Sequence, residues 1–225
     1  MTSQLLAPWH QKFPGVIAGS VYAAKPPARV AVARALSAAG LDVHVDIMAE
    51  TEGLPAGVSL SELRDIARAV GGARLGVQLI GSVEFVDRVL PRILPLRPAT
   101  VFLPWAAFNG ERARAIRGCG GAAWIALWNE WDGVEDLRWP AVPDGVLVML
   151  IEPGTRDSSA LDRLGIVAAC AAELPVAVDG GITKDIAPLC VTAGAESIVV
   201  GRALLLDLPP PLGLPTAPAH FERNQ

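Results

Sequence analysis

Short apolar runs rich in Val, Ile, Leu and Ala alternate along the chain with longer segments in which apolar residues recur at helical spacing. Apolar runs of this kind are typical of parallel strands buried on both faces, and their alternation with helices predicts βαβ units. The predicted strands are Gly15–Ser20, Leu41–Met48, Arg74–Ile80, Thr100–Leu103, Ala122–Trp128, Gly145–Ile151, Pro175–Asp179 and Ser197–Val200. The predicted helices are Pro27–Ala39, Ser59–Val70, Ser82–Leu94, Glu111–Arg117, Val134–Leu137, Ser158–Glu173 and Ile186–Ala193. Eight strands favour closure into a (β/α)8 barrel, the TIM-barrel class of α/β fold, over an open doubly wound sheet.

Several element boundaries have local causes. Ser59 is placed to cap a helix and Glu62 to reach back to it, which is a capping box. Glycines follow three predicted helices, where a residue with left-handed backbone ends a helix at little cost; these are Gly40, Gly71 and Gly194. The segment Pro209–Pro218 is rich in proline, so we expect only one or two helical turns after the last strand.

Length and composition narrow the class of protein. A chain of 225 residues fits one barrel domain over 1–225, with a short N-terminal lead-in and a proline-rich tail from about 209. The net charge of −4, without a basic stripe, argues against nucleic acid as a partner. Three scattered cysteines favour a reducing cytoplasm over a disulfide framework. Residues 1–14 do not resemble a signal peptide, and no apolar run predicts a membrane span.

The second predicted strand carries polar residues on one face. Alternation places Val43, Val45 and Ile47 towards the helices, and the barrel interior then receives Asp42, His44, Asp46 and Met48. Charged groups inside a barrel are unfavourable unless they are paired or bind a metal ion. Because barrel active sites lie at the carboxyl ends of the strands, Asp46 is a candidate catalytic residue. The alternatives are a buried hydrogen-bonded network, or an edge strand that exposes these residues.

Two later strands end in sequences typical of phosphate loops. Asp179 closes one strand and is followed by Gly180 and Gly181, whose backbone can approach an anion closely. The last strand ends in Gly201 and Arg202, and an arginine can bind phosphate through two hydrogen bonds. Barrels commonly bind phosphate with the loops after strands 7 and 8. The alternatives are a plain turn at the two glycines and a surface arginine without a ligand.

Five segments together resemble the ribulose-phosphate 3-epimerase family, over roughly Val16 to Leu205. They read Gly-Ser-Val-Tyr at 19–22, His-Val-Asp-Ile-Met at 44–48, Met-Leu-Ile-Glu-Pro-Gly at 149–154, Val-Asp-Gly-Gly-Ile at 178–182 and Ala-Gly-Ala…Val-Gly-Arg-Ala from 193 to 203. The resemblance implies an isomerase of a phosphorylated ketose, with two aspartates on opposite faces of the substrate. Asp46 and Asp179 match these two positions.

The resemblance also implies a metal site and substrate contacts. A divalent metal (zinc, manganese or iron) would be held by His44 and the two aspartates, and no organic cofactor is expected. Substrate contacts are implied for Ser20, Met48, Met149 and Gly154. The expected partner is a small phosphorylated sugar, and family members often form homo-oligomers.

The chain departs from the family at the second metal histidine and in two loops. Gln78 stands where the family has that histidine, and a glutamine oxygen is a weaker zinc ligand than imidazole. Ile80 replaces a methionine, and the segments 49–55 and 155–158 differ from the family's substrate-covering loops. Glu50 and Glu52 are expected in a solvated loop, with metal ligation as the alternative.

Three functions therefore stay open. The first is an epimerase of a ketose phosphate, and the second is a diverged barrel enzyme with another reaction on a related sugar phosphate. Against a lyase of that second kind, the lysines (Lys12, Lys25 and Lys184) lie on no predicted strand. The third is a phosphate-binding barrel without catalysis. Two single residues also carry expectations. Arg156, in the loop after the sixth strand, could contact the phosphate, with a solvated position as the alternative. His10, near the N-terminus, is expected to be solvated.

Overall fold

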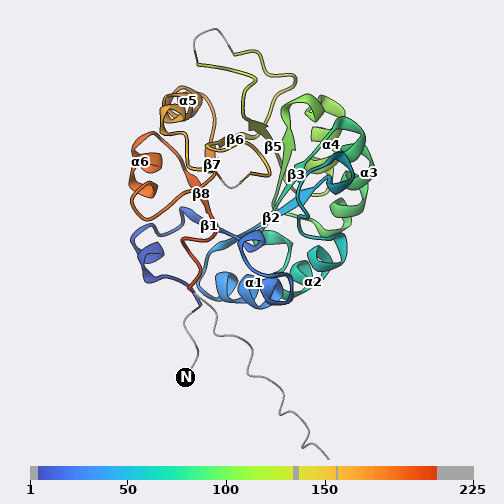
Figure 1. The fold of residues 1–225 in the computed structure, drawn as a ribbon. Coiled ribbons are helices and arrows are strands. Elements are labelled where there is room, and N and C mark those ends of the chain that lie inside the picture. Colours follow the sequence, from blue (N-terminus) through green and yellow to red (C-terminus); the bar gives the residue numbers. More distant parts are fainter. Residues whose placement is uncertain (1–4, 134–136, 156, 207–225) are drawn as a thin grey trace, which may run out of the picture.

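The computed structural model describes residues 5–133, 137–155 and 157–206. Within these residues eight parallel strands form a closed barrel, in which each strand pairs with the next and β8 pairs with β1 (Figure 1). The strands are β1 (Ile17–Ser20), β2 (Asp42–Met48), β3 (Leu75–Ile80), β4 (Thr100–Pro104), β5 (Ala122–Leu127), β6 (Gly145–Met149), β7 (Val176–Asp179) and β8 (Ser197–Val200). The predicted (β/α)8 TIM barrel is confirmed.

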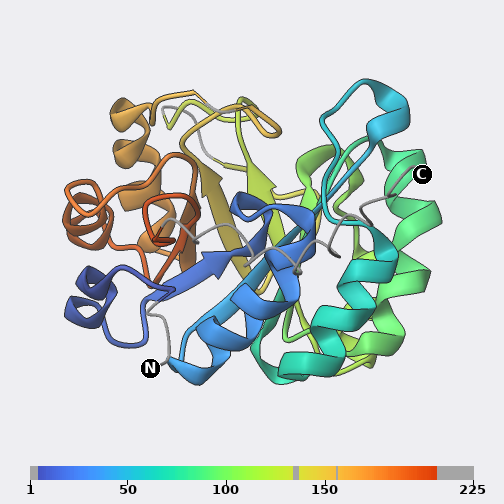
Figure 2. The ribbon, with the colours of Figure 1, turned by 60° about the horizontal axis from the view of Figure 1, so that its bottom comes forward.

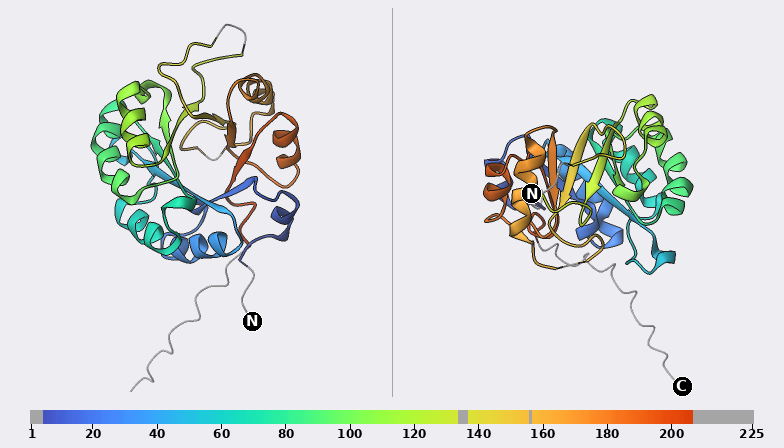
Figure 3. Two further views of the ribbon diagram at one scale, coloured as in Figure 1. Left: turned by 180° about the vertical axis from the view of Figure 1, so that it is seen from behind. Right: turned by 90° about the horizontal axis from the view of Figure 1, so that it is seen from above.

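The α-helices of the described residues surround this ring of strands, which Figure 3 shows from behind and from above. They are α1 (Arg29–Ala38), α2 (Leu60–Val70), α3 (Val83–Ile93), α4 (Gly110–Gly118), α5 (Leu164–Ala171) and α6 (Ala187–Thr192). The capping box at α2 is confirmed, since Ser59 Oγ accepts from the backbone N–H of Glu62 while the Glu62 carboxylate accepts from that of Ser59. None of the described helices has the length and apolar character required to cross a membrane.

The helix predicted over Ser158–Glu173 is wrong at its N-terminal end. A 3-10 turn over Leu161–Arg163 leads into α5, and the preceding residues are not helical. Ser159 Oγ instead donates to the carbonyl of Gly180 (2.6 Å), and the Ala160 N–H donates to the carbonyl of Leu150 (2.7 Å). These bonds hold the segment against the ends of β6 and β7. Three other predictions concern residues outside the described ranges. They are the helix at 134–137, of which only residue 137 is described, the proline-rich tail from about 209, and the role of Arg156.

The N-terminal lead-in occupies the place where a helix would follow β8. Residues 202–204 form a turn and none of residues 201–206 is helical, so the predicted one or two helical turns are absent there. Leu6 forms an antiparallel bridge with Leu205, and Trp9 Nε1 donates to the carbonyl of Ala203 (3.0 Å). In Figure 2 the lead-in, in dark blue, lies next to the dark red segment that follows β8. The prediction that His10 is solvated is wrong, because this packing leaves it 8% exposed with Nδ1 2.6 Å from the Ala7 carbonyl.

The strands separate two apolar layers. Val43, Val45 and Ile47 belong to the large layer between strands and helices, as predicted. A smaller cluster fills the barrel itself; it comprises Ala18, Phe102, Ala126, Leu147, Met149, Ala177 and Val199, with Trp124 and Trp128 packed against it. Asp42, by contrast, is exposed at the amino end of β2 beside Arg74 (3.7 Å), so its predicted interior position is wrong.

Candidate active site at the carboxyl ends of the strands

A cavity of about 520 Å3 lies at the carboxyl ends of the strands. Both predicted aspartates and every predicted substrate- or phosphate-binding residue line it; these are Ser20, Asp46, Met48, Met149, Gly154, Asp179, Gly180, Gly181, Gly201 and Arg202. The two other predicted metal ligands, His44 and Gln78, do not line the cavity and are almost fully buried, at 2% and 1% exposed. The fold therefore brings the sequence-predicted residues to one end of the barrel.

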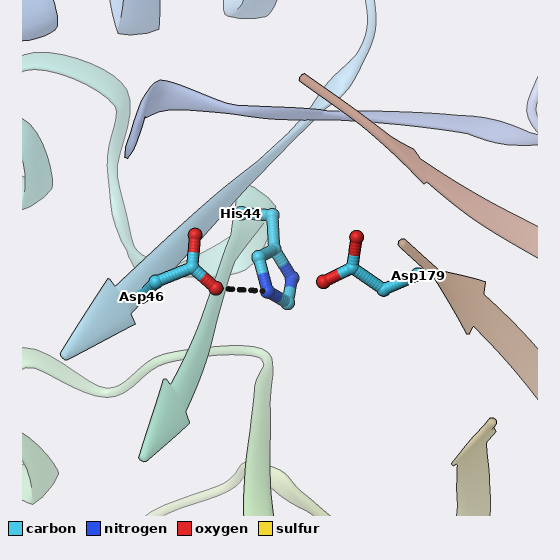
Figure 4. Close-up of side chains that lie close together, drawn as sticks. All are labelled: His44, Asp46 and Asp179. Carbon is cyan, nitrogen blue, oxygen red and sulfur yellow. Dashed lines mark hydrogen bonds and ion pairs between the residues drawn. The ribbon is translucent and has the colours of Figure 1, made fainter. Parts of the chain in front are cut away.

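His44 lies between the two aspartates (Figure 4). Asp46 comes from β2 and Asp179 from β7. Because both strands belong to one closed barrel, these two residues meet although they are far apart in the sequence. His44 Nε2 is 3.2 Å from Asp46 Oδ1, and one ligand atom from each of the three residues lies within 4.8 Å of the others. A histidine nitrogen and two carboxylate oxygens at this spacing are suited to a divalent cation.

Gln78 and Ser20 complete the polar network. Gln78 Oε1 lies 3.0 Å from His44 Nε2, and Gln78 Nε2 points to Met149 Sδ at 3.5 Å. Ser20 Oγ donates to Asp46 Oδ2 at 2.9 Å, so both carboxylate oxygens of Asp46 are engaged. The glutamine adds a further oxygen at the histidine nitrogen, and the donor set therefore fits a divalent metal with three oxygen ligands and one nitrogen.

The proximity of these groups changes their pKa values. Burial alone would lower the pKa of His44, but the charge and hydrogen bond of Asp46, the charge of Asp179 and the hydrogen bond of Gln78 together raise it to about 9. Burial raises the pKa of Asp179 to about 7; the positive charge of His44 opposes this rise and the negative charge of Asp46 adds to it. A carboxyl group with a pKa near neutrality can both accept and release a proton.

The loops after β7 and β8 form an end of the cavity suited to anions. Among the described residues, no backbone carbonyl accepts from the N–H groups of Gly181, Gly201 and Arg202. Gly180 has a φ of 122°, and a Cβ there would lie 2.7 Å from the Ile151 nitrogen, so the approach requires glycine. Free N–H groups beside an arginine are complementary to phosphate.

Several residues that line the cavity were not predicted from the sequence. Tyr22 and Thr155 line the cavity from the loops after β1 and β6, and Thr183 lines it just beyond the two glycines. Each lies a few residues beyond a strand end; Tyr22 also belongs to the Gly-Ser-Val-Tyr segment and Thr155 to the loop that differs from the family, but neither was assigned a role. Glu52, offered as an alternative metal ligand, instead accepts from the N–H (2.8 Å) and hydroxyl (2.7 Å) of Ser82 at the start of α3.

A family model described as "Ribulose-phosphate 3 epimerase family" matches residues 16–205. The chain belongs to this family. The match spans all eight strands, including those that carry Asp46 and Asp179, and it confirms the resemblance seen in the sequence. Family membership makes this a barrel enzyme of the phosphosugar-related class, while leaving its reaction open.

Solved structures share the fold of this ribulose-phosphate 3-epimerase family member at low sequence identity. Phosphoribosyl anthranilate isomerase from Thermus thermophilus has a TM-score of 0.56 at 15% identity, covering 84% of this chain and 88% of that one. A mutant tryptophan synthase α-subunit from Pyrococcus furiosus has a TM-score of 0.59 at 13% identity, with the same coverage of 84% and 88%. Orotidine 5'-phosphate decarboxylase from Pyrococcus horikoshii OT3 has a TM-score of 0.54 at 14% identity, covering 84% and 90%. Among curated proteins no match was found.

Proposed function

We propose that the protein is an isomerase that epimerises a phosphorylated ketose similar to ribulose 5-phosphate. The observation that carries this proposal is the placement of Asp46 and Asp179 on facing strands of one cavity whose other end is suited to phosphate. Membership in the ribulose-phosphate 3-epimerase family supports the choice of substrate class.

The two aspartates divide the proton transfer between them. One carboxylate removes the proton from the carbon beside the carbonyl, and the other returns a proton to the opposite face, which inverts that carbon. Ser20 Oγ holds one oxygen of Asp46 in a fixed orientation. Asp179, whose pKa burial raises to about 7, is suited to carry a proton at neutral pH.

A divalent metal would be held by His44, Asp46, Asp179 and the side-chain oxygen of Gln78. When bound, such an ion stabilises the negative charge that develops on the substrate oxygens after proton removal. Zinc, manganese and iron are the candidates, and the three oxygen ligands favour manganese or iron more than a two-histidine site would.

The phosphate group of the substrate would lie at Gly180, Gly181, Gly201 and Arg202, and the reacting carbons would then face Met48 and Met149. None of the strands in the described residues carries a lysine, so a lyase that forms an imine with its substrate is not supported at these positions.

The test is hydrogen exchange into substrate. Ribulose 5-phosphate and related ketose phosphates are incubated with the protein in deuterated water, and deuterium beside the carbonyl is followed by proton NMR. We expect uptake with at least one ketose phosphate, and its loss in Asp46→Asn and in Asp179→Asn. Asp65→Asn, which changes an exposed aspartate on α2 away from the cavity, serves as the matched control.

No exchange with any of these substrates in metal-supplemented protein would overturn the proposal. If inorganic phosphate still binds in that case, the result would instead favour a ligand-binding barrel without catalysis.

A further inference from the structure

Tyr22 is the only tyrosine of the chain, and it lines the cavity from the turn that directly follows β1. That turn is a 3-10 helix over Val21–Ala23. Val21 is fully buried in the layer between strands and helices, which anchors the turn, while Tyr22 and Ala23 both line the cavity. The turn therefore presents a phenol ring to the ligand space.

The hydroxyl of Tyr22 has no hydrogen-bond partner among the described residues. In that same part of the chain every buried side-chain oxygen or nitrogen has a partner. The hydroxyl is consequently accessible, and it can donate to a molecule that enters the cavity.

The turn that carries Tyr22 packs against the anion end of the cavity. A Cβ atom placed on Gly201 would lie 3.2 Å from the Cβ of Ala23, so the two loops are in close contact. The turn thus touches the loop that offers the free N–H groups of Gly201 and Arg202.

Arg29 contacts the tyrosine ring. Its guanidinium carbon lies 5.7 Å from the ring centroid, within the range of a cation–π contact. Arg29 is only 5% exposed, and its Nη1 donates to the Gly57 carbonyl (3.1 Å) and to Glu62 (3.1 Å) while its Nε donates to the Ala24 carbonyl (3.3 Å). An arginine with this many partners is fixed in place.

We propose that Tyr22 determines specificity by donating its hydroxyl hydrogen to the phosphate group of the ligand, with Arg29 as the residue that positions the ring. The inference rests on the proposed function, because it assumes that a phosphate monoester occupies the anion end. It extends that function by adding a side-chain donor that the backbone groups and Arg202 do not supply, and it favours phosphorylated over unphosphorylated sugars.

The first test removes only the hydroxyl. Tyr22→Phe keeps the ring and its contact with Arg29, so inorganic phosphate binding measured by calorimetry reports on the hydroxyl alone. We expect the dissociation constant to rise about ten- to hundredfold, as for the loss of one hydrogen bond to a charged group. Thr192→Val, which deletes a hydroxyl that donates to the Pro188 carbonyl on α6, should leave the constant unchanged.

The second test uses the fact that nitration by tetranitromethane can modify only one tyrosine in this chain. We expect inorganic phosphate to slow nitration of Tyr22 in the wild-type protein. Arg29→Lys, which keeps the charge but loses the planar fork, should weaken this protection while the protein stays folded by circular dichroism.

The outcomes separate the two proposals. If the wild-type protein binds phosphate, but Tyr22→Phe binds it equally well and phosphate does not slow nitration, the role of Tyr22 is overturned and the proposed function stands. If the wild-type protein binds no phosphate, the phosphate end of the proposed function fails and the inference about Tyr22 fails with it.

Discussion

Gln78 Oε1 lies 3.0 Å from His44 Nε2, and Asp46 Oδ1 lies 3.2 Å from the same nitrogen. One ring nitrogen thus faces two oxygen acceptors, which requires that Nε2 carry a hydrogen in the metal-free protein. A cation that binds between these oxygens must displace that hydrogen, so metal binding and protonation of His44 compete. The glutamine is therefore a partner for the imidazole, and in the proposed metal site it would also be a ligand for the cation.

Replacing Gln78 with histidine should change the metal preference. Imidazole binds zinc more strongly than an amide oxygen does, so we expect Gln78→His to increase zinc affinity about tenfold or more, with a smaller gain for manganese. Chelator competition with metal-stripped protein measures both constants.

The control for this prediction is Gln78→Leu, which fills a similar volume without a donor atom. It should weaken the binding of both metals. Equal zinc affinities for the wild-type protein and the histidine variant would show that position 78 does not contact the ion.

The stability of the metal-free protein should fall as the pH rises. A group whose pKa is raised by folding binds its proton more tightly in the folded state, so its stabilising effect is lost as the pH rises through the folded pKa. For Asp179 this window runs from 3.8 to about 7, and for His44 from 6.5 to about 9. Each group contributes a slope of at most about 1.4 kcal/mol per pH unit within its window.

Urea unfolding across this pH range, in the presence of a chelator, measures the effect. His44→Gln should flatten the upper part of the curve and Asp179→Asn the lower part. If the free energy of unfolding instead rose between pH 6.5 and 9, the pKa of His44 would not be raised by folding, and the prediction would be wrong.

The barrel was predictable because apolar residues recur at a different spacing in helices than in strands, and because buried parallel strands are nearly continuous apolar runs. The polar face of β2 was predictable for the same reason, since a period of two sends His44 and Asp46 inward together. The place of Asp179 follows from the closed barrel, in which the carboxyl ends of all strands meet at one face.

What the sequence did not reveal depends on contacts between distant segments. Ser159 leaves the helical pattern because the carbonyl of Gly180 accepts its hydroxyl, and His10 is buried because the lead-in packs beside the end of β8. Tyr22 lies in the Gly-Ser-Val-Tyr segment that resembles the family, but a single tyrosine after a strand is compatible with many environments and its role was not predicted. Local patterns do not encode such tertiary hydrogen bonds.

The three thiols should differ in reactivity. Burial raises the pKa values of Cys170 and Cys190 to about 11, whereas Cys119 is only half-buried at the end of α4. Because the thiolate is the reactive form, we expect Ellman's reagent to modify Cys119 first in the native protein, and all three thiols after unfolding. Cys119→Ser should abolish the native reaction, and rapid native modification of a second thiol would disagree with the burial described here.

The barrel interior depends on a glycine that makes room for a tryptophan. A Cβ at Gly145 on β6 would lie 2.5 Å from the ring of Trp124 on the neighbouring strand β5, and Trp124 in turn packs edge-to-face on Phe102. Gly145→Ala should therefore overpack the interior and lower the free energy of unfolding by about 1–3 kcal/mol. Urea denaturation measures this loss.

The glycine substitution can be separated from a general effect of alanine by two further variants. Gly118→Ala, at the end of α4 with no atom near the new Cβ, should have little effect or stabilise slightly, because alanine favours the helix. Trp124→Leu costs stability on its own, since it leaves a cavity, but it removes the ring that the new methyl group meets. In the double variant the two losses should therefore be less than additive, by about 1 kcal/mol. If the two changes in the free energy of unfolding were strictly additive, the new methyl group at position 145 would not contact the Trp124 ring, and the prediction would be wrong.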